Sequence, residues 1–158
     1  MGKVLIAYYH TGGSTEQMAE YIGEGVRIDG HEADVKEITD VDPAKNLSGY
    51  DGYIFGSPTY HLDVPDTMKK FLLKVQIAVL DGKVELEGKP GGSFGPYTHD
   101  VGYRHDNHAP AIMFATLQNS LKMKPFELGS LILTEAIVET PEGLKACHEY
   151  GKIFGRKL

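Results

Sequence analysis

The 158-residue sequence contains no tryptophan and a single cysteine, Cys147. One cysteine cannot form an intrachain disulfide, so nothing in the sequence points to an oxidising compartment. Leu144, Cys147, Gly151 and Phe154 recur at nearly helical spacing. This pattern predicts that Cys147 packs in the core and does not act as a reactive thiol.

Positive charge and long apolar runs are also scarce. Sixteen Lys and Arg stand against 22 Asp and Glu, which gives a formal net charge of −6. This balance argues against nucleic acid or an anionic membrane as the main partner and suits a partner with a basic face, although solubility alone also explains it. The apolar run over 1–7 is too short for a signal peptide, and no stretch approaches membrane-spanning length. We therefore expect a cytoplasmic protein with no membrane or nucleic-acid partner.

Short apolar runs alternate with longer amphipathic segments along the whole chain. The patterns predict strands over 3–9, 32–38, 53–56, 89–94 and 129–137, and helices over 14–27, 65–75, 110–121 and 141–154. Pro65, Pro110 and Pro141 suit first helical positions. Strands that alternate with helices indicate parallel pairing, and hence one α/β domain over 1–158 built as a three-layer sandwich. Ligands of such sheets lie beyond the carboxyl ends of strands, where the strand order reverses.

The run His10-Thr11-Gly12-Gly13-Ser14-Thr15 follows the first predicted strand and leads directly into a helix. Glycines let backbone N–H groups converge, the helix start adds positive potential, and three hydroxyls add donors, so the run is typical of a phosphate-binding loop. It lacks the lysine of a P-loop and the three-glycine spacing of a dinucleotide site. The alternative is an ordinary helix start after a glycine turn, capped by Ser14 or Thr15.

Aromatic residues follow two further predicted strands. Tyr60 comes after the third strand, behind the rigid Pro58, where it is placed to stack on a planar ligand. After the fourth strand, Tyr97 and Tyr103 offer a second stacking face, and the small residues of that strand would let its backbone approach a flat ring. The loop with Tyr60, taken alone, is equally explained as a surface turn with an incidental tyrosine.

Three short runs of the sequence together resemble the flavodoxin family. They are Val-Leu-Ile-Ala-Tyr-Tyr (4–9), Gly-Ser-Pro-Thr-Tyr (56–60) and Gly-Ser-Phe-Gly-Pro-Tyr (92–97), and the resemblance extends over essentially the whole chain. It implies a five-stranded parallel sheet of order 2-1-3-4-5, for which flavodoxin is a standard example, and flavin mononucleotide (FMN) bound at the switch point between strands one and three.

The resemblance also implies a set of FMN-binding residues. These are His10, Thr11, Gly12, Gly13, Ser14, Thr15, Pro58, Thr59, Tyr60, His61, Phe94, Gly95, Pro96, Tyr97 and Tyr103. Thr11, Gly13, Ser14 and Thr15 would hold the phosphate, while Tyr60 and Tyr97 would take the two stacking positions. His61 stands where electron-carrier flavodoxins commonly have glycine, so we expect the backbone there to resist positive φ.

The segment 99–108 holds His99, His105 and His108 with Asp100 and Asp106. Histidine and carboxylate are ligands for zinc or iron, but this spacing matches no familiar metal motif. We expect a polar loop over the flavin and no metal site. A metal site and an unremarkable surface loop are the alternatives.

Two functions follow from the resemblance. The first is an electron-transfer protein that shuttles electrons between redox partner proteins with basic faces. The alternative is an NAD(P)H-dependent FMN quinone reductase that takes a nicotinamide and a small acceptor; His61 and the histidine-bearing loop favour it modestly, because imidazoles near the flavin can handle protons. A signalling receiver domain would need paired acidic residues after the first strand, where Tyr8, Tyr9 and His10 stand instead.

Overall fold

The computed structural model describes residues 1–97 and 108–158. Its elements are, in chain order, β1 (Lys3–Tyr8), α1 (Thr15–Arg27), β2 (Glu32–Glu37), the 3-10 turn η1 (Ile38–Asp40), β3 (Gly52–Gly56), α2 (Asp66–Leu80), β4 (Pro90–Tyr97), α3 (Ala109–Asn119), β5 (Lys124–Thr134), α4 (Glu135–Val138) and α5 (Pro141–Gly155). The predicted alternation of strands and helices is therefore confirmed.

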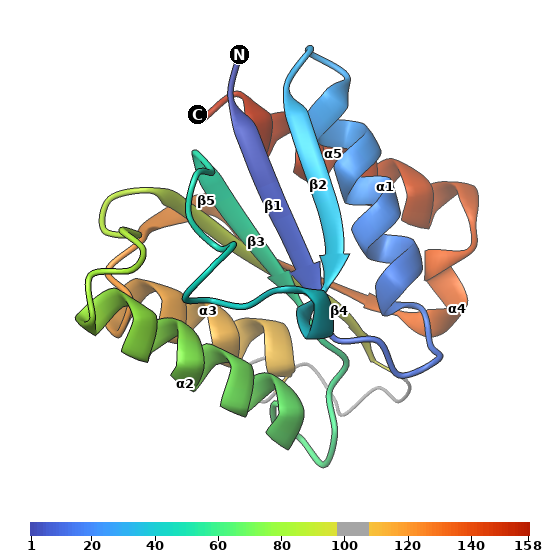
Figure 1. Cartoon of the computed structure of the whole chain (residues 1–158). Coiled ribbons are helices and arrows are strands. Elements are labelled where there is room, and N and C mark those ends of the chain that lie inside the picture. The colour runs from blue at the N-terminus through green and yellow to red at the C-terminus, as the bar shows by residue number, and fades with distance from the viewer. Residues whose placement is uncertain (98–107) are drawn as a thin grey trace.

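The five strands form one sheet of order β2-β1-β3-β4-β5. Every neighbouring pair is parallel, so all the carboxyl ends lie at one edge, which is the lower edge in Figure 1. The predicted 2-1-3-4-5 order is confirmed. The order reverses between β1 and β3, where the expected site lies.

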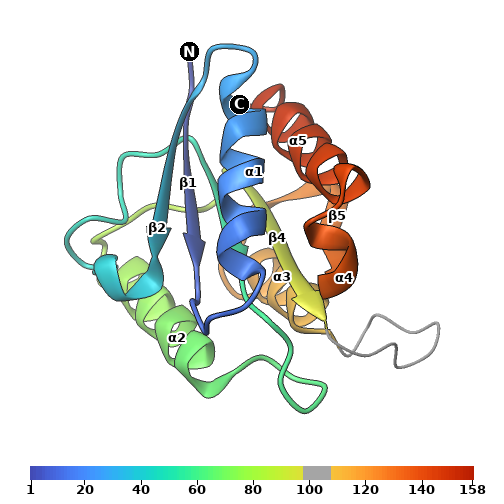
Figure 2. The same cartoon turned by 90° about the vertical axis from the view of Figure 1, so that its right-hand side faces the viewer.

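Side chains of β1 alternate between the two faces of the sheet. Val4, Ile6 and Tyr8 pack with α1 and α5 in one apolar cluster, whereas Leu5 and Ala7 pack with α2 and α3 in the other. Figure 2 shows the two pairs of helices on opposite sides of the sheet. Burial on both faces is typical of parallel sheets and makes β1 a near-continuous apolar run.

The helices α1 and α5 approach each other very closely. A Cβ on Gly25 would collide with the backbone carbonyl of His148, and one on Gly151 would collide with that of Ile22. Cys147 lies in this layer with no exposed surface. Burial raises the pKa of its thiol to about 12, which confirms the prediction that Cys147 is a core residue.

Several predicted boundaries were wrong, and the start of α2 and the position of the last strand are two of them. Pro65 is the N-cap of α2 and has extended backbone, so the helix begins one residue later than expected. The last strand covers Lys124–Thr134 in place of 129–137, because Lys124 and Pro125 pair with the start of β4. Beyond Thr134 the chain turns into α4, where Val138 is fully buried.

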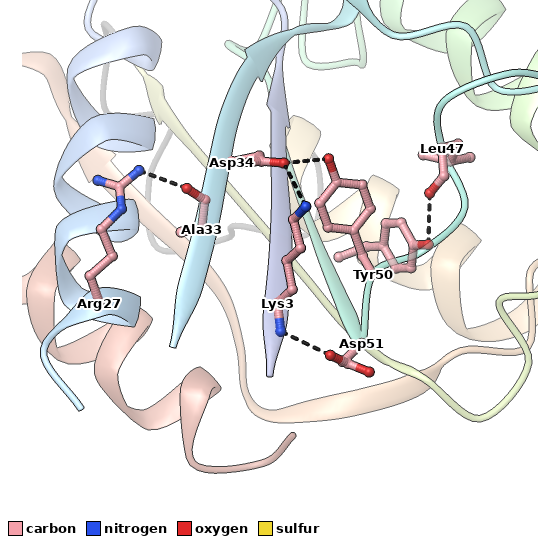
Figure 3. Close-up of polar contacts among 8 residues, drawn as sticks. Lys3, Arg27, Ala33, Asp34, Leu47, Tyr50 and Asp51 are labelled. Atoms are coloured by element: carbon pink, nitrogen blue, oxygen red, sulfur yellow. Dashed lines mark hydrogen bonds and ion pairs between the residues drawn. The ribbon is translucent and has the colours of Figure 1, made fainter. Parts of the chain in front are cut away.

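A polar cluster joins the amino-terminal half of the sheet to the connection before β3 (Figure 3). The Tyr50 hydroxyl donates to a carboxylate oxygen of Asp34 at 2.6 Å, and the Lys3 ammonium lies 3.5 Å from the same oxygen. The hydrogen bond from Tyr50 is the main reason that the pKa of Asp34 is lowered.

None of the helices within residues 1–97 and 108–158 has both the length and the hydropathy that crossing a bilayer requires.

The contact between α1 and α5 predicts that Gly25→Ala destabilises the protein. Overpacking costs about 1–3 kcal/mol, which exceeds the roughly 1 kcal/mol that alanine gains over glycine in a helix. We expect urea unfolding to show a net loss, whereas Glu20→Ala on the exposed face of α1 should change stability by less than about 0.5 kcal/mol. A Gly25→Ala protein as stable as its parent would contradict this packing.

The Tyr50–Asp34 bond predicts a pH-dependent effect of Tyr50→Phe. Because the folded-state pKa of Asp34 is lowered, the bond stabilises the protein above the unfolded pKa near 4 and is lost as pH falls through the lower folded value. We expect a loss of about 1 kcal/mol at pH 7, since solvent screens this partly exposed carboxylate. The loss should shrink below pH 4 in unfolding titrations, whereas the effect of Tyr21→Phe, which keeps its ring contact with His148, should not depend on pH there.

Candidate functional site

The loops that follow β1, β3 and β4 enclose a cavity of about 370 Å³ at the carboxyl edge of the sheet. Its lining residues are Thr11, Gly12, Gly13, Thr15, Pro58, Thr59, Tyr60, Pro96, Tyr97 and Glu135. The structure thus brings together the predicted phosphate loop and both predicted stacking tyrosines that lie in the described residues.

Thr15 is the most informative residue of the first loop. It is the first residue of α1 and is 1% exposed, yet its Oγ1 has no hydrogen-bond partner. Ser14 occupies the N-cap position, but its side chain makes no capping bond. The alternative of an ordinary capped helix start therefore leaves a buried hydroxyl unsatisfied, which costs about 1–3 kcal/mol unless an outside group accepts from it. An anion at the helix start would do so.

His10 lies beside this loop without lining the cavity. Its Nδ1 is 3.3 Å from a carboxylate oxygen of Glu16, and its ring meets that of Tyr8 edge-on. Burial and then the Glu16 carboxylate raise the pKa of Tyr8 to about 12. This group of side chains ties the start of the loop to the first turn of α1.

Tyr60 precedes a tight turn of unusual composition. Backbone N–H groups of Tyr60 and Asp63 each donate to the other's carbonyl at 3.0 Å, and the two residues between them, His61 and Leu62, have φ of 50° and 59°. Such values are typical of type I′ turns, which favour glycine and asparagine. The expectation that His61 would resist positive φ was wrong. Ladder-like bonds on both sides hold the turn at a cost of about 1–2 kcal/mol for each non-glycine residue.

Contacts on either side hold the turn in place. The Asp63 carboxylate accepts from the Val64 N–H at 2.7 Å and from the Lys69 ammonium at 2.6 Å. The hydrogen bond from Lys69 is the largest cause of the lowered pKa of Asp63. On the other side, Thr59 Oγ1 accepts from the backbone N–H of Ala109, the first residue of α3, at 2.8 Å. Tyr60, which is 43% exposed, is therefore presented on a fixed loop.

Tyr97 ends β4 and also lines the cavity. Its ring stacks on the imidazole of His108, with centroids 4.6 Å apart and planes inclined by 27°. Phe94 differs from the expectation, because its side chain is fully buried in the core and its carbonyl accepts from the Ser57 N–H at 3.1 Å. Gly95 is also outside the lining, and a Cβ there would collide with the Ser57 carbonyl.

The predicted residues therefore fall into three groups. Nine line the cavity, as given above. His10, Ser14, His61, Phe94 and Gly95 are adjacent to its loops without lining it. Tyr103 and the segment 98–107, with His99 and His105, lie outside the described residues. Within the described residues no group of three or more His, Cys, Asp or Glu is arranged to hold a metal ion.

Glu135 is a cavity residue that the sequence analysis missed. It was placed inside the last predicted strand, whereas β5 ends at Thr134 and Glu135 begins α4. The signal was available in principle, because a polar residue directly after a strand of a parallel sheet is a site candidate. The wrong strand boundary concealed it.

Comparison with known families identifies the chain. The family model described as Flavodoxin matches residues 6–147. The chain belongs to the flavodoxin family. Members of this family bind FMN, so this chain is an FMN-binding protein.

Curated relatives carry two kinds of name. An NAD(P)H dehydrogenase (quinone) from Cupriavidus metallidurans is 33% identical over 113 residues, which cover 60% of this chain and 56% of that protein. A flavodoxin from Clostridium saccharobutylicum is 36% identical over 93 residues, or 58% of this chain and 54% of that protein. The matched part spans about half the length of these relatives.

Solved structures of flavodoxins match along their whole length. A flavodoxin from the domain Archaea has a TM-score of 0.79 and 26% identity, with 98% of this chain and 97% of that chain covered. Flavodoxin 2 from Bacillus cereus has a TM-score of 0.78 and 25% identity, with 99% of each chain covered. The flavodiiron protein of Giardia intestinalis, at 23% identity and a TM-score of 0.80, shares the fold over 36% of its own chain.

The cavity residues fit FMN. Thr15 supplies a buried hydroxyl without a partner at the start of α1, where a phosphate is stabilised by the helix and its N–H groups. Tyr60 and Tyr97 supply aromatic rings from β3 and β4 loops for a flat ring system. Among the described residues of the lining, Glu135 is the one whose charge opposes the phosphate.

Thr15→Val tests the phosphate assignment. A buried hydrogen bond to a charged group contributes about 1.5–3 kcal/mol, so FMN affinity should fall by roughly 10- to 150-fold. Riboflavin lacks the phosphate and should lose less than about threefold, as judged by fluorescence titration of the apoprotein. Thr67→Val, on the exposed start of α2, serves as the control. An equal loss for FMN and riboflavin would mean that Thr15 does not contact the phosphate.

Proposed function

We propose that this chain is an electron carrier that passes electrons between redox partner proteins. The observation that carries the proposal is the cavity whose lining brings together Thr15, which has an unpartnered buried hydroxyl, and the rings of Tyr60 and Tyr97. FMN, when bound, supplies the ability to accept and donate electrons. Cytoplasmic location is part of the proposal and is supported by the single, buried cysteine.

The chain's own residues would bind and orient the cofactor. Thr11 and Thr15 donate at the phosphate end, while Tyr60 and Tyr97 provide faces on which the ring system stacks. Because Tyr60 stands on a turn held by Asp63 and Thr59, its ring needs little rearrangement when the cofactor enters. Since Tyr60 is 43% exposed, this side of the site lies at the surface, where a partner protein has access.

The surface next to the site is acidic, and we call it the acidic mouth; it is defined by Glu16, Glu20, Glu135 and Glu139. Its charge favours partners with basic faces. A second cavity, of about 470 Å³, shares Gly12, Gly13 and Glu135 with the first and is also lined by Glu16, Glu20 and Glu139. Among the described residues that line either cavity there is no Lys or Arg. Clustered charge of one sign steers an oppositely charged protein toward the site and raises its association rate.

A second candidate is an NAD(P)H-dependent quinone reductase. Its support is the 33% identity to the NAD(P)H dehydrogenase (quinone) of Cupriavidus metallidurans. Such an enzyme would need room for a nicotinamide and then a small acceptor over one face of the flavin.

Flavin titration followed by anaerobic mixing with NADH or NADPH separates the candidates. We expect FMN to bind and FAD to be rejected, and we expect neither nicotinamide to bleach the bound flavin within seconds. A redox partner or a chemical reductant should bleach it. Rapid bleaching by a nicotinamide, followed by turnover with a quinone, would replace the carrier with the reductase. Failure to bind any flavin would contradict both.

The acidic mouth predicts salt-dependent electron transfer to a basic acceptor. With a basic c-type cytochrome as the probe, Glu20→Lys combined with Glu139→Lys should slow transfer from the reduced protein by about tenfold or more at low ionic strength. The difference should shrink as salt is added. The matched control is Glu85→Lys with Glu87→Lys, which makes the same charge change at exposed positions between α2 and β4. Equal slowing by both pairs would show that net charge alone matters.

A further inference from the structure

Glu135 lies beside the loop that would hold the phosphate of a flavin. It follows β5 directly, one residue after Thr134, which pairs with Tyr97. One of its carboxylate oxygens is 3.2 Å from the position that a Cβ on Gly13 would occupy. The residue lines both cavities, and in the first of them it shares the lining with Thr15. In Figure 1, α4 stands next to the connection from β1 to α1.

The charges around this carboxylate do not balance an anion. Glu16, Glu20 and Glu139 line the adjoining cavity, and the described lining of the two cavities includes no Lys or Arg. His10 is the nearby imidazole of the loop, but its Nδ1 faces Glu16 at 3.3 Å. From the loops after β3 and β4, the titratable groups of the lining are the hydroxyls of Tyr60 and Tyr97.

A phosphate monoester carries between one and two negative charges near neutral pH, because its second ionisation lies near pH 6. The start of α1, its N–H groups and the Thr15 hydroxyl attract such an anion. The Glu135 carboxylate repels the phosphate, because holding two negative charges close together costs free energy. A proton placed between the two groups turns the repulsion into a charge-assisted hydrogen bond.

We propose that Glu135 is a specificity-determining residue of the flavin site and that it couples FMN binding to the uptake of a proton. The proton comes from water and is held between a phosphate oxygen and a Glu135 carboxylate oxygen, so that the phosphate binds as its monoanion. This inference rests on the proposed FMN site. It makes preference for FMN over riboflavin strong at acidic pH and weaker as pH rises.

Calorimetric titration of the apoprotein tests the coupling directly. FMN and riboflavin are each titrated at pH 5.5 and pH 8.0, in two buffers that differ in ionisation enthalpy, with the parent protein, Glu135→Gln and Glu139→Gln. For the parent at pH 8.0 we expect FMN to bind with uptake of about one proton and riboflavin with none.

Glu135→Gln should abolish most of this uptake and tighten FMN at pH 8.0 by about tenfold or more, while at pH 5.5 the gain shrinks to about twofold. Its affinity for riboflavin should stay within about twofold of the parent at both pH values, which also shows that the variant is folded. Glu139→Gln makes the same charge change in the adjoining cavity alone, and its FMN affinity should change by less than about threefold.

Other outcomes overturn the inference in distinct ways. Unchanged proton uptake and an unchanged FMN-to-riboflavin ratio in Glu135→Gln would remove Glu135 from the phosphate site. Equal weakening of both flavins would make Glu135 an acceptor for the ribityl hydroxyls. A parent protein that binds neither flavin would contradict the proposed function itself, whatever Glu135 does.

Discussion

The burial of β1 on both faces is the constraint on which the rest of the structure depends. Its five residues after Lys3 alternate between the two apolar clusters, so each helical layer is held to the sheet through the same strand. A strand in that position must have parallel neighbours joined by helices, because hairpins would leave one face uncovered. The carboxyl ends of β1, β3 and β4 then meet at one edge, and the loops that follow them have to share one space.

This constraint explains how much of the molecule was predictable from sequence. Periodicity identified nearly every helix and strand, because fully buried strands and amphipathic helices leave strong patterns. The same logic located Thr11, Thr15, Tyr60 and Tyr97, since polar and aromatic residues directly after buried strands had few other roles. These positions depend on the order of elements along the chain and need no knowledge of detailed side-chain contacts.

What was not predictable depends on tertiary contacts. The sequence predicts Phe94 as a site residue, but its ring is buried in the core. Gly56 on the neighbouring strand has no Cβ, and this leaves room for the ring. His61 accepts positive φ only because Tyr60 and Asp63 pair across the turn and Lys69 holds Asp63. Glu135 was hidden because the pairing of Lys124 and Pro125 with β4 moves the last strand toward the amino terminus. Each case is a contact between segments distant in sequence or a local strain overridden by its surroundings.

The features that break local rules gather around the cavity. An unpartnered buried hydroxyl and two non-glycine residues at positive φ each raise the free energy of the folded chain, and a carboxylate beside an anion site raises it once an anion binds. A bound anion can accept a hydrogen bond from the Thr15 hydroxyl, whereas it repels the carboxylates around the cavity. Under the proposed function the acidic mouth meets two opposing demands, because the field that would attract a basic partner also repels the phosphate of the cofactor. A proton shared between Glu135 and the phosphate would reconcile them, since it removes charge at the phosphate without changing Glu16, Glu20 and Glu139 in the adjoining cavity. Under this proposal the site can bind a phosphate next to an acidic mouth because the Glu135 carboxylate takes up a proton when the cofactor binds.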